Sequence, residues 1–212
     1  GDPKGAIDHY RVALQEDPKR LGALMGMGHA NAMSGNLDKA LYYFKRVRRY
    51  HPSHTKALEA AVRSAMAAND PRKAEMALRE EKGQFPDRHD TYGLLVQFYM
   101  RQDRDDDALT VVNDLLSRDA ESSIGLRLKA MLLMQKSDFT NAILVLQTAA
   151  RVAPSAEVFA TLGEAFMGLI KMPEAIESLQ KALALNSDHP QALFQLAEAH
   201  RKSQQWIKAF YL

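Results

Sequence analysis

One small residue recurs at an almost constant interval along the whole of this 212-residue chain. Successive members of the series are 34 residues apart, with a single interval of 33. They are Ala6, Ala40, Ala74, Ala108, Ala142, Ala175 and Ala209. A fixed period of this length indicates a structure in which one supersecondary unit is stacked repeatedly, so that each unit buries its apolar face against its neighbours.

Other residue positions keep the same period. Four residues after the alanine stands a large apolar residue, at Tyr10, Phe44, Leu78, Val112, Leu146 and Leu179. A second set comprises Leu24, Leu58, Tyr92, Leu126, Phe159 and Leu193, followed four residues later by Gly28, Val62, Val96, Ala130, Gly163 and Ala197. Spacings of three, four and seven define one face of an α-helix. Proline, which ends helices, closes most units. Each unit is therefore predicted to contain a helix A, a short turn and a helix B.

This pattern of sizes and spacings resembles the tetratricopeptide repeat family over essentially the whole chain. The resemblance implies an all-α fold, an α-α superhelix in which antiparallel helix pairs form a right-handed solenoid. It also implies that helices A line a concave groove. We expect one domain, 1–212, with a partial unit at 1–20, full units at 21–54, 55–88, 89–122, 123–155 and 156–189, and a partial unit at 190–212.

Both ends of the chain fall within a repeat unit. The last six residues, "IKAFYL", are mostly apolar, whereas a solenoid normally ends in a polar capping helix. We therefore expect a piece of a longer array, with Phe210, Tyr211 and Leu212 exposed. The alternative is that neighbouring molecules supply the missing halves, so that the chain associates with itself through its ends. Trp206 shares a repeat position with Leu37, Phe139 and Met172, and we expect it to pack at the start of a helix B.

Composition restricts the possible functions. The net charge is only +2, which gives no reason to expect a nucleic acid as partner. No apolar run approaches the roughly 18 residues that span a bilayer, so membrane insertion is not expected. The chain has no cysteine, which excludes disulfides and thiolate metal sites. The compartment stays open between the cytoplasm and a bacterial periplasm.

Several local clusters have ordinary structural interpretations. His51 and His54 could be half of a zinc site, but no third ligand is visible, and we expect a solvated loop. Asp103, Asp105 and Asp107 have the spacing of the first calcium ligands in an EF-hand, but the required glycine is absent, so we expect a helix-capping turn. The basic stretch "KRVRRY" at 45–50 is interpreted as a favourable charge distribution at a helix end. Glu81, at a position that is usually small and apolar, is interpreted with Gly83 as a frayed helix end.

No catalytic, cofactor-binding or metal-binding set is predicted, so we expect a protein that is not an enzyme. The carboxylate clamp of chaperone-binding members of the family is missing, because Met25, His29, Ala60, Asp90 and Leu94 occupy its positions. The groove instead carries a methionine at one repeat position, in Met66, Met100, Met134 and Met167. Methionine is used on surfaces that accept varied apolar partners, although it also fills seams between helices, and both interpretations stay open. The expected polar rim consists of Arg63, Gln97, Arg101, Arg127, Met131, Gln135 and Glu164.

We consider three functions. The first is a protein–protein interaction scaffold that binds a peptide or a partner helix in the groove. The second is a regulatory or substrate-recruiting arm of a larger enzyme, such as a glycosyltransferase. The third is a scaffold for secretion or polysaccharide export in a bacterial envelope.

Overall fold

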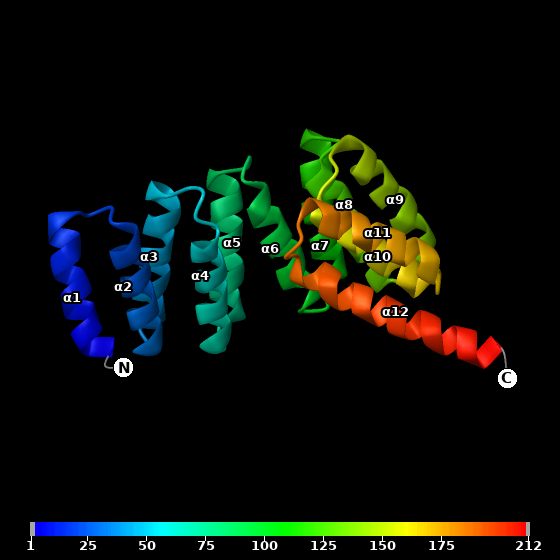
Figure 1. Cartoon of the computed structure of the whole chain (residues 1–212). Helices are drawn as coiled ribbons and strands as arrows, with labels where there is room; N and C mark the ends of the chain where they lie inside the picture. The colour runs from blue at the N-terminus through cyan, green and yellow to red at the C-terminus, as the bar shows by residue number, and fades with distance from the viewer. Residues whose placement is uncertain (1–2, 211–212) are drawn as a thin grey trace. The chain divides into compact units, whose positions relative to one another are not determined.

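A computed structural model describes the backbone of residues 3–210 and the side chains of residues 3–203. This part of the chain contains twelve α-helices and no strand, which confirms the predicted all-α fold (Figure 1). The helices are α1 (Pro3–Glu16), α2 (Leu21–Met33), α3 (Leu37–Tyr50), α4 (Lys56–Ala67), α5 (Pro71–Gln84), α6 (His89–Met100), α7 (Asp105–Arg118), α8 (Ser123–Gln135), α9 (Phe139–Val152), α10 (Ala156–Gly168), α11 (Met172–Leu185) and α12 (Pro190–Phe210). No helix within these bounds is long and apolar enough to cross a membrane.

The chain divides into two compact units, Gly1–Phe98 and Tyr99–Leu212. In the first unit, helices α1 to α5 each pack against the next helix along the chain, and the same is true of α7 to α12 in the second unit. Even-numbered helices also contact one another, α2 with α4 and α10 with both α8 and α12. Within each unit the even-numbered helices, which are the predicted helices A, therefore form a common surface, here called the A-helix face.

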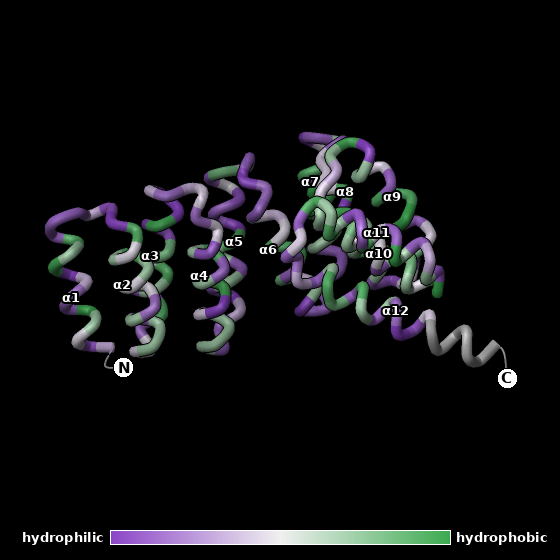
Figure 2. Tube along the Cα trace, viewed as in Figure 1, coloured by the Kyte–Doolittle hydropathy of each residue, from purple (hydrophilic) through white to green (hydrophobic). Residues whose placement is uncertain are grey.

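The alternation of polar and apolar segments along the helices explains this packing (Figure 2). Ala40, Ala74, Ala108, Ala142 and Ala175 are all fully buried, as their shared repeat position predicts. Two glycines allow still closer contact between helices A and B. A Cβ at Gly28 would lie 2.4 Å from the ring of Phe44, and one at Gly163 would lie 2.6 Å from Cγ of Leu179. Most of the apolar positions found in the sequence are thus helix contacts, but on α12 the prediction is wrong for Leu193, which is 48% exposed, and for Ala197, which is also exposed. The side chain of Ala209 lies outside the described residues.

The turns between helices A and B obey the same period. One residue in each has a positive φ: 75° at Gly35, 56° at Asn69, 54° at Asp103, 61° at Ser137 and 60° at Ile170. These residues are 34, 34, 34 and 33 positions apart in the sequence. The turn conformation is therefore as regular as the helix packing. Asp103 belongs to such a turn, as expected, but the predicted cap is wrong, because the N-cap residue of α7 is Arg104 and its side chain makes no capping hydrogen bond.

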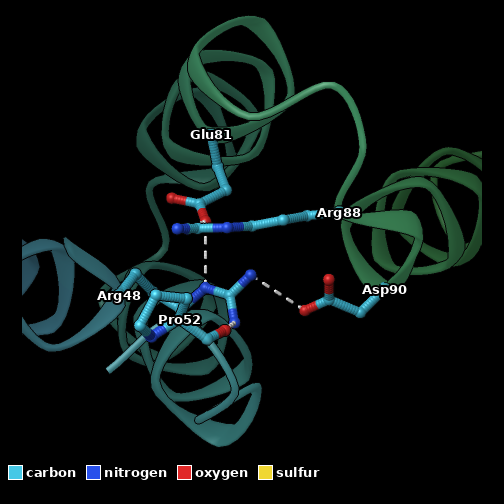
Figure 3. Close-up of polar contacts among 5 residues, drawn as sticks. All are labelled: Arg48, Pro52, Glu81, Arg88 and Asp90. Atoms are coloured by element: carbon cyan, nitrogen blue, oxygen red, sulfur yellow. Dashed lines mark hydrogen bonds and ion pairs between the residues drawn. The ribbon is translucent and has the colours of Figure 1, made fainter. Parts of the chain in front are cut away.

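The end of α5 differs from the prediction. The helix continues to Gln84, and Glu81 is buried at 6% exposure, so the interpretation as a frayed end is wrong. The physical reason is a buried partner, because Nε of Arg48 donates to Oε1 of Glu81 at 2.9 Å (Figure 3). Arg88 also donates to that oxygen, while Arg48 donates to the Pro52 carbonyl at 2.7 Å and pairs with Asp90 at 3.0 Å. Here a charged network replaces the apolar contact found in other units.

Helix α12 is longer than the others. It continues as a single helix to Phe210, so Trp206 lies within α12 rather than at the start of a separate helix B. Its packing, and the exposure predicted for Phe210, Tyr211 and Leu212, fall outside the side chains that the structure describes.

Candidate functional site

The predicted groove residues are divided between the two units. The first unit contains Met66, which is 39% exposed on α4, together with the exposed Arg63 and Gln97. The second unit contains the other members, Met100, Arg101, Arg127, Met131, Met134, Gln135, Glu164 and Met167. Because most of the predicted site belongs to the second unit, its A-helix face is the place where these groups can act together.

The methionines of the predicted groove that belong to the second unit are partly buried rather than fully exposed. Met134 packs against the core cluster that contains Leu146, and Met167 packs against the cluster that contains Leu179. These two side chains therefore contribute to the core, as the seam-filling interpretation requires. Each also keeps part of its surface accessible, as do Met100 and Met131.

Glutamine side chains fix the carboxylate of Glu164 on α10. Oε2 of Glu164 accepts from Nε2 of Gln191 at 3.0 Å and from Nε2 of Gln195 at 2.9 Å, and both donors belong to α12. Gln135 is likewise held, because its Nε2 donates to Oδ1 of Asp105 at 3.0 Å. These polar side chains have defined orientations before any partner binds, which lowers the entropy cost of recognition.

Arg127 lies in a half-buried position on α8. Its Nη1 contacts Sδ of Met131 at 3.4 Å, a weak acceptor. Burial lowers the pKa of Arg127, and the charge of Glu157 opposes that shift. A guanidinium that is partly removed from water and bonded to sulfur retains a strong capacity to donate to an oxygen acceptor.

Glu157 and His189 complete a row of ionisable groups across α8, α10 and the start of α12. A hydrogen bond from its own backbone N–H lowers the pKa of Glu157 most, and the Ser155 hydroxyl and the charges of His189 and Arg127 lower it further, against the effect of burial. His189 is buried, and its Nδ1 accepts from the backbone N–H of Ala192 at 3.2 Å. The face thus presents fixed charges of both signs.

Four of these polar residues are absent from the predicted site: Glu157, His189, Gln191 and Gln195. The strongest signal in the sequence is Gln195, which occupies a repeat position held elsewhere by Gly26, Ala60, Leu94, Leu128 and Thr161. Its Oε1 is buried and has no hydrogen-bond partner among the described residues. A polar residue at a mostly apolar repeat position therefore marks the neighbourhood of Glu164.

Two other polar clusters belong to the first unit. The basic stretch at 45–50 is divided among separate partners, with Lys45 paired to Glu80, Arg46 bonded to the Pro18 carbonyl at 2.7 Å and Arg48 in the buried network. Nε2 of His51 contacts the Lys19 carbonyl at 2.5 Å. No group of three His, Cys, Asp or Glu side chains suited to a metal ion occurs within the described part of the chain.

Comparison with solved structures gives several similar folds. A thermophilic TPR protein from Thermus thermophilus is 18% identical with a TM-score of 0.61, and the match covers 84% of this chain and 98% of that one. Yeast Tom70 is also 18% identical, with a TM-score of 0.66, and the match covers 94% of this chain but only 43% of Tom70. A tetratricopeptide repeat protein from Parabacteroides merdae is 16% identical with a TM-score of 0.62, over 93% of this chain and 78% of that one.

Sequence comparison with protein families points the same way. One tetratricopeptide repeat model matches residues 1–61 and 65–132, and a second matches residues 160–209. No curated protein matches the sequence significantly. The matched segments include most of the helix pairs described above. The chain belongs to the tetratricopeptide repeat family.

Proposed function

We propose that this chain is a non-enzymatic scaffold whose A-helix face binds a peptide or a partner helix. The observation that supports the proposal is that Arg127, Gln135 and Glu164 of the second unit each have a defined polar contact, while Met134 and Met167 on the same helices keep part of their surface accessible. Apolar anchors with polar groups at the rim are the usual composition of a protein-binding surface. Tetratricopeptide repeats are generally non-catalytic, and the solved Cut9–Hcn1 structure, an APC/C hetero-tetramer, contains this fold at 17% identity and a TM-score of 0.56.

The two kinds of side chain have separate roles in the proposal. Met134 and Met167, with Met100 and Met131, supply flexible apolar contacts that adapt to a partner. Arg127 donates to a carboxylate or carbonyl oxygen of the partner, and Gln135 and Glu164 set its register along the helices. The first unit carries the same kinds of apolar and polar groups in Met66, Arg63 and Gln97. The second unit carries one more such polar group, Arg101.

An affinity experiment with purified variants tests this function. The bait is the chain immobilised by a terminal tag, and recovered proteins are compared between wild type and a variant with alanine at Met66, Met100, Met134 and Met167. The matched control replaces Leu144 and Leu185, which are 57% and 54% exposed and lie on the odd-numbered helices α9 and α11. We expect the quadruple variant to lose partners that the control retains, with both variants folded by circular dichroism. Equal recovery by wild type and the quadruple variant would contradict the proposal.

A further inference from the structure

A hollow lies in the first unit, on the side of the odd-numbered helices. It has a volume of about 290 Å³ and lies between α3 and α5, with α4 as its floor. Leu41 and Tyr42 line it from α3, Ala57 and Ala61 from α4, and Met76 from α5. We call this hollow the α3–α5 groove. Tyr42 is 56% exposed and Met76 is 68% exposed, so large apolar side chains stand at its opening.

The groove exists because its floor is built from small residues. At the same repeat positions as Ala57 and Ala61, α8 of the second unit carries Gly125 and Lys129, and α10 carries Val158 and Leu162. Those larger side chains are buried on α10, where they fill space that alanine leaves empty. The two alanines of α4 that line the groove, Ala57 and Ala61, therefore leave space between α3 and α5.

Charged side chains around the groove neutralise one another. Lys73 pairs with Asp38 at 2.6 Å, Lys45 pairs with Glu80, and Arg48 pairs with Glu81 at 2.9 Å, and each pair joins α3 to α5. The hydrogen bond with Asp38 raises the pKa of Lys73, which keeps that lysine charged. A charged ligand would have to compete with these pairs, whereas an uncharged apolar group would leave them intact. The charge pattern thus selects an occupant that is neutral where it touches the groove.

The walls also select the backbone conformation of the occupant. Backbone N–H and C=O groups of α3 and α5 are used within their own helices, so they offer no edge for an extended peptide. Two neighbouring helices instead present a furrow that accepts the side-chain ridge of a third helix. A volume of about 290 Å³ lies at the lower limit for small-molecule sites, roughly 300–1,000 Å³, and suits a few side chains rather than a cofactor.

We propose that the α3–α5 groove is a second docking site, distinct from the A-helix face, for an amphipathic helix of a partner protein. The partner inserts a pair of large apolar residues, such as leucine at positions i and i+4, between Tyr42 and Met76. It carries no charge on the turn that enters the groove.

Methyl NMR of the methionines tests the proposal with a defined probe. The probe is an end-capped helical peptide of alanine and glutamine with one Leu-x-x-x-Leu pair, and the protein is labelled with ¹³C at all ten methionine methyl groups. We expect the Met76 resonance to shift saturably on titration. A peptide with alanine in place of the leucines should cause no shift, and one with glutamate in their place should bind at least tenfold more weakly.

Two variants fill the groove from different sides and keep the test informative if one of them fails to fold. Ala61→Leu introduces from the floor the residue that α10 carries, and Ala77→Leu narrows the groove from α5. Each folded variant should weaken binding of the leucine peptide at least tenfold, while Leu144→Ala, an exposed change on α9, should leave it unchanged. An unshifted Met76 resonance at millimolar peptide, or undiminished binding to the filled variants, would overturn the proposal. Shifts of Met66, Met100, Met134 and Met167 report separately on the A-helix face, so the two proposals fail independently.

Discussion

Ile170 shows how one residue can oppose the conformation that its repeat position requires. Its φ of 60° is in the left-handed region, where the equivalent turns use Gly35, Asn69, Asp103 and Ser137. A β-branched residue there costs about 1–2 kcal/mol, and Ile170 is 55% exposed, so packing recovers little of that cost. We expect Ile170→Asn to raise the free energy of unfolding by about 1 kcal/mol in urea denaturation. The control, Gly35→Ile, should lower it, and a destabilising Ile170→Asn change would contradict this reasoning.

Glu81 shows the opposite case, in which an unexpected residue is stabilised by its surroundings. Arg48 is 1% exposed and depends on Glu81, Asp90 and the Pro52 carbonyl for partners. Removing one partner of a buried ion pair costs about 3–5 kcal/mol, whereas replacing both by apolar residues is far less costly. We therefore expect Glu81→Leu to destabilise the chain strongly in thermal unfolding. The double variant Arg48→Met/Glu81→Leu should recover most of the loss, and a single change that costs less than about 1 kcal/mol would contradict the network's importance.

At the scale of the helix, the repeated alanine sets the distance between neighbours. Ala142 is fully buried on α9, in a cluster with Leu146, Ala149 and Leu162. Its methyl group leaves no room for a longer side chain at the helix crossing, so Ala142→Leu should destabilise by about 1–3 kcal/mol through overpacking. Gln147→Leu, at an exposed position of the same helix, is the matched control. Equal midpoints for the two variants in urea would show that the crossing tolerates larger residues.

The first turn of α10 makes a pH-dependent contribution to the stability of the folded chain. The pKa of Glu157 is below its ordinary value of 4.5 because its carboxylate accepts a hydrogen bond from its own backbone N–H, with Ser155, His189 and Arg127 adding to the effect. A carboxyl whose pKa is depressed on folding stabilises the folded state above its unfolded-state pKa, and this contribution is lost as the pH falls through the folded-state value.

Glu157→Gln should therefore lower the melting temperature at pH 7 and have progressively less effect as the pH falls below about 4.5. Calorimetric melting of both proteins between pH 3 and pH 7 measures the difference. A difference that stays constant over this range would mean that the ionised carboxylate is not responsible.

At the scale of the whole molecule, the sequence predicts packing much better than it predicts the site. Ala40 and Leu146 belong to positions that repeat in every unit. Several residues therefore give evidence for the same helix contact, and one unusual residue does not change the prediction. Gln195 and Arg48 each stand at their repeat position in one unit only. Gln195 depends on Glu164, 31 residues away in the sequence, and Arg48 depends on Glu81, 33 residues away. Periodicity cannot reveal such pairs, because it shows only what the units share.

The same repetition makes stability a property of neighbouring helices. Leu146 is fully buried, and α9 contacts α8 and α10 directly. Leu146→Ala should cost about 2–5 kcal/mol, because the cavity cannot collapse between three packed helices. In a stacked array the loss acts mainly through nearest-neighbour interfaces.

Amide hydrogen exchange of Leu146→Ala should therefore accelerate most in α8, α9 and α10, and less in α12, which contacts α10 but is separated from α9 by that helix. Gln147→Ala, an exposed change on α9, should leave the exchange pattern of α8 and α10 unchanged. Uniform acceleration from α7 to α12 would show instead that these helices open as one cooperative block. Graded exchange would mean that each helix is stabilised mainly by its immediate neighbours. A partner bound to the A-helix face would then stabilise the helices it touches more than the other helices.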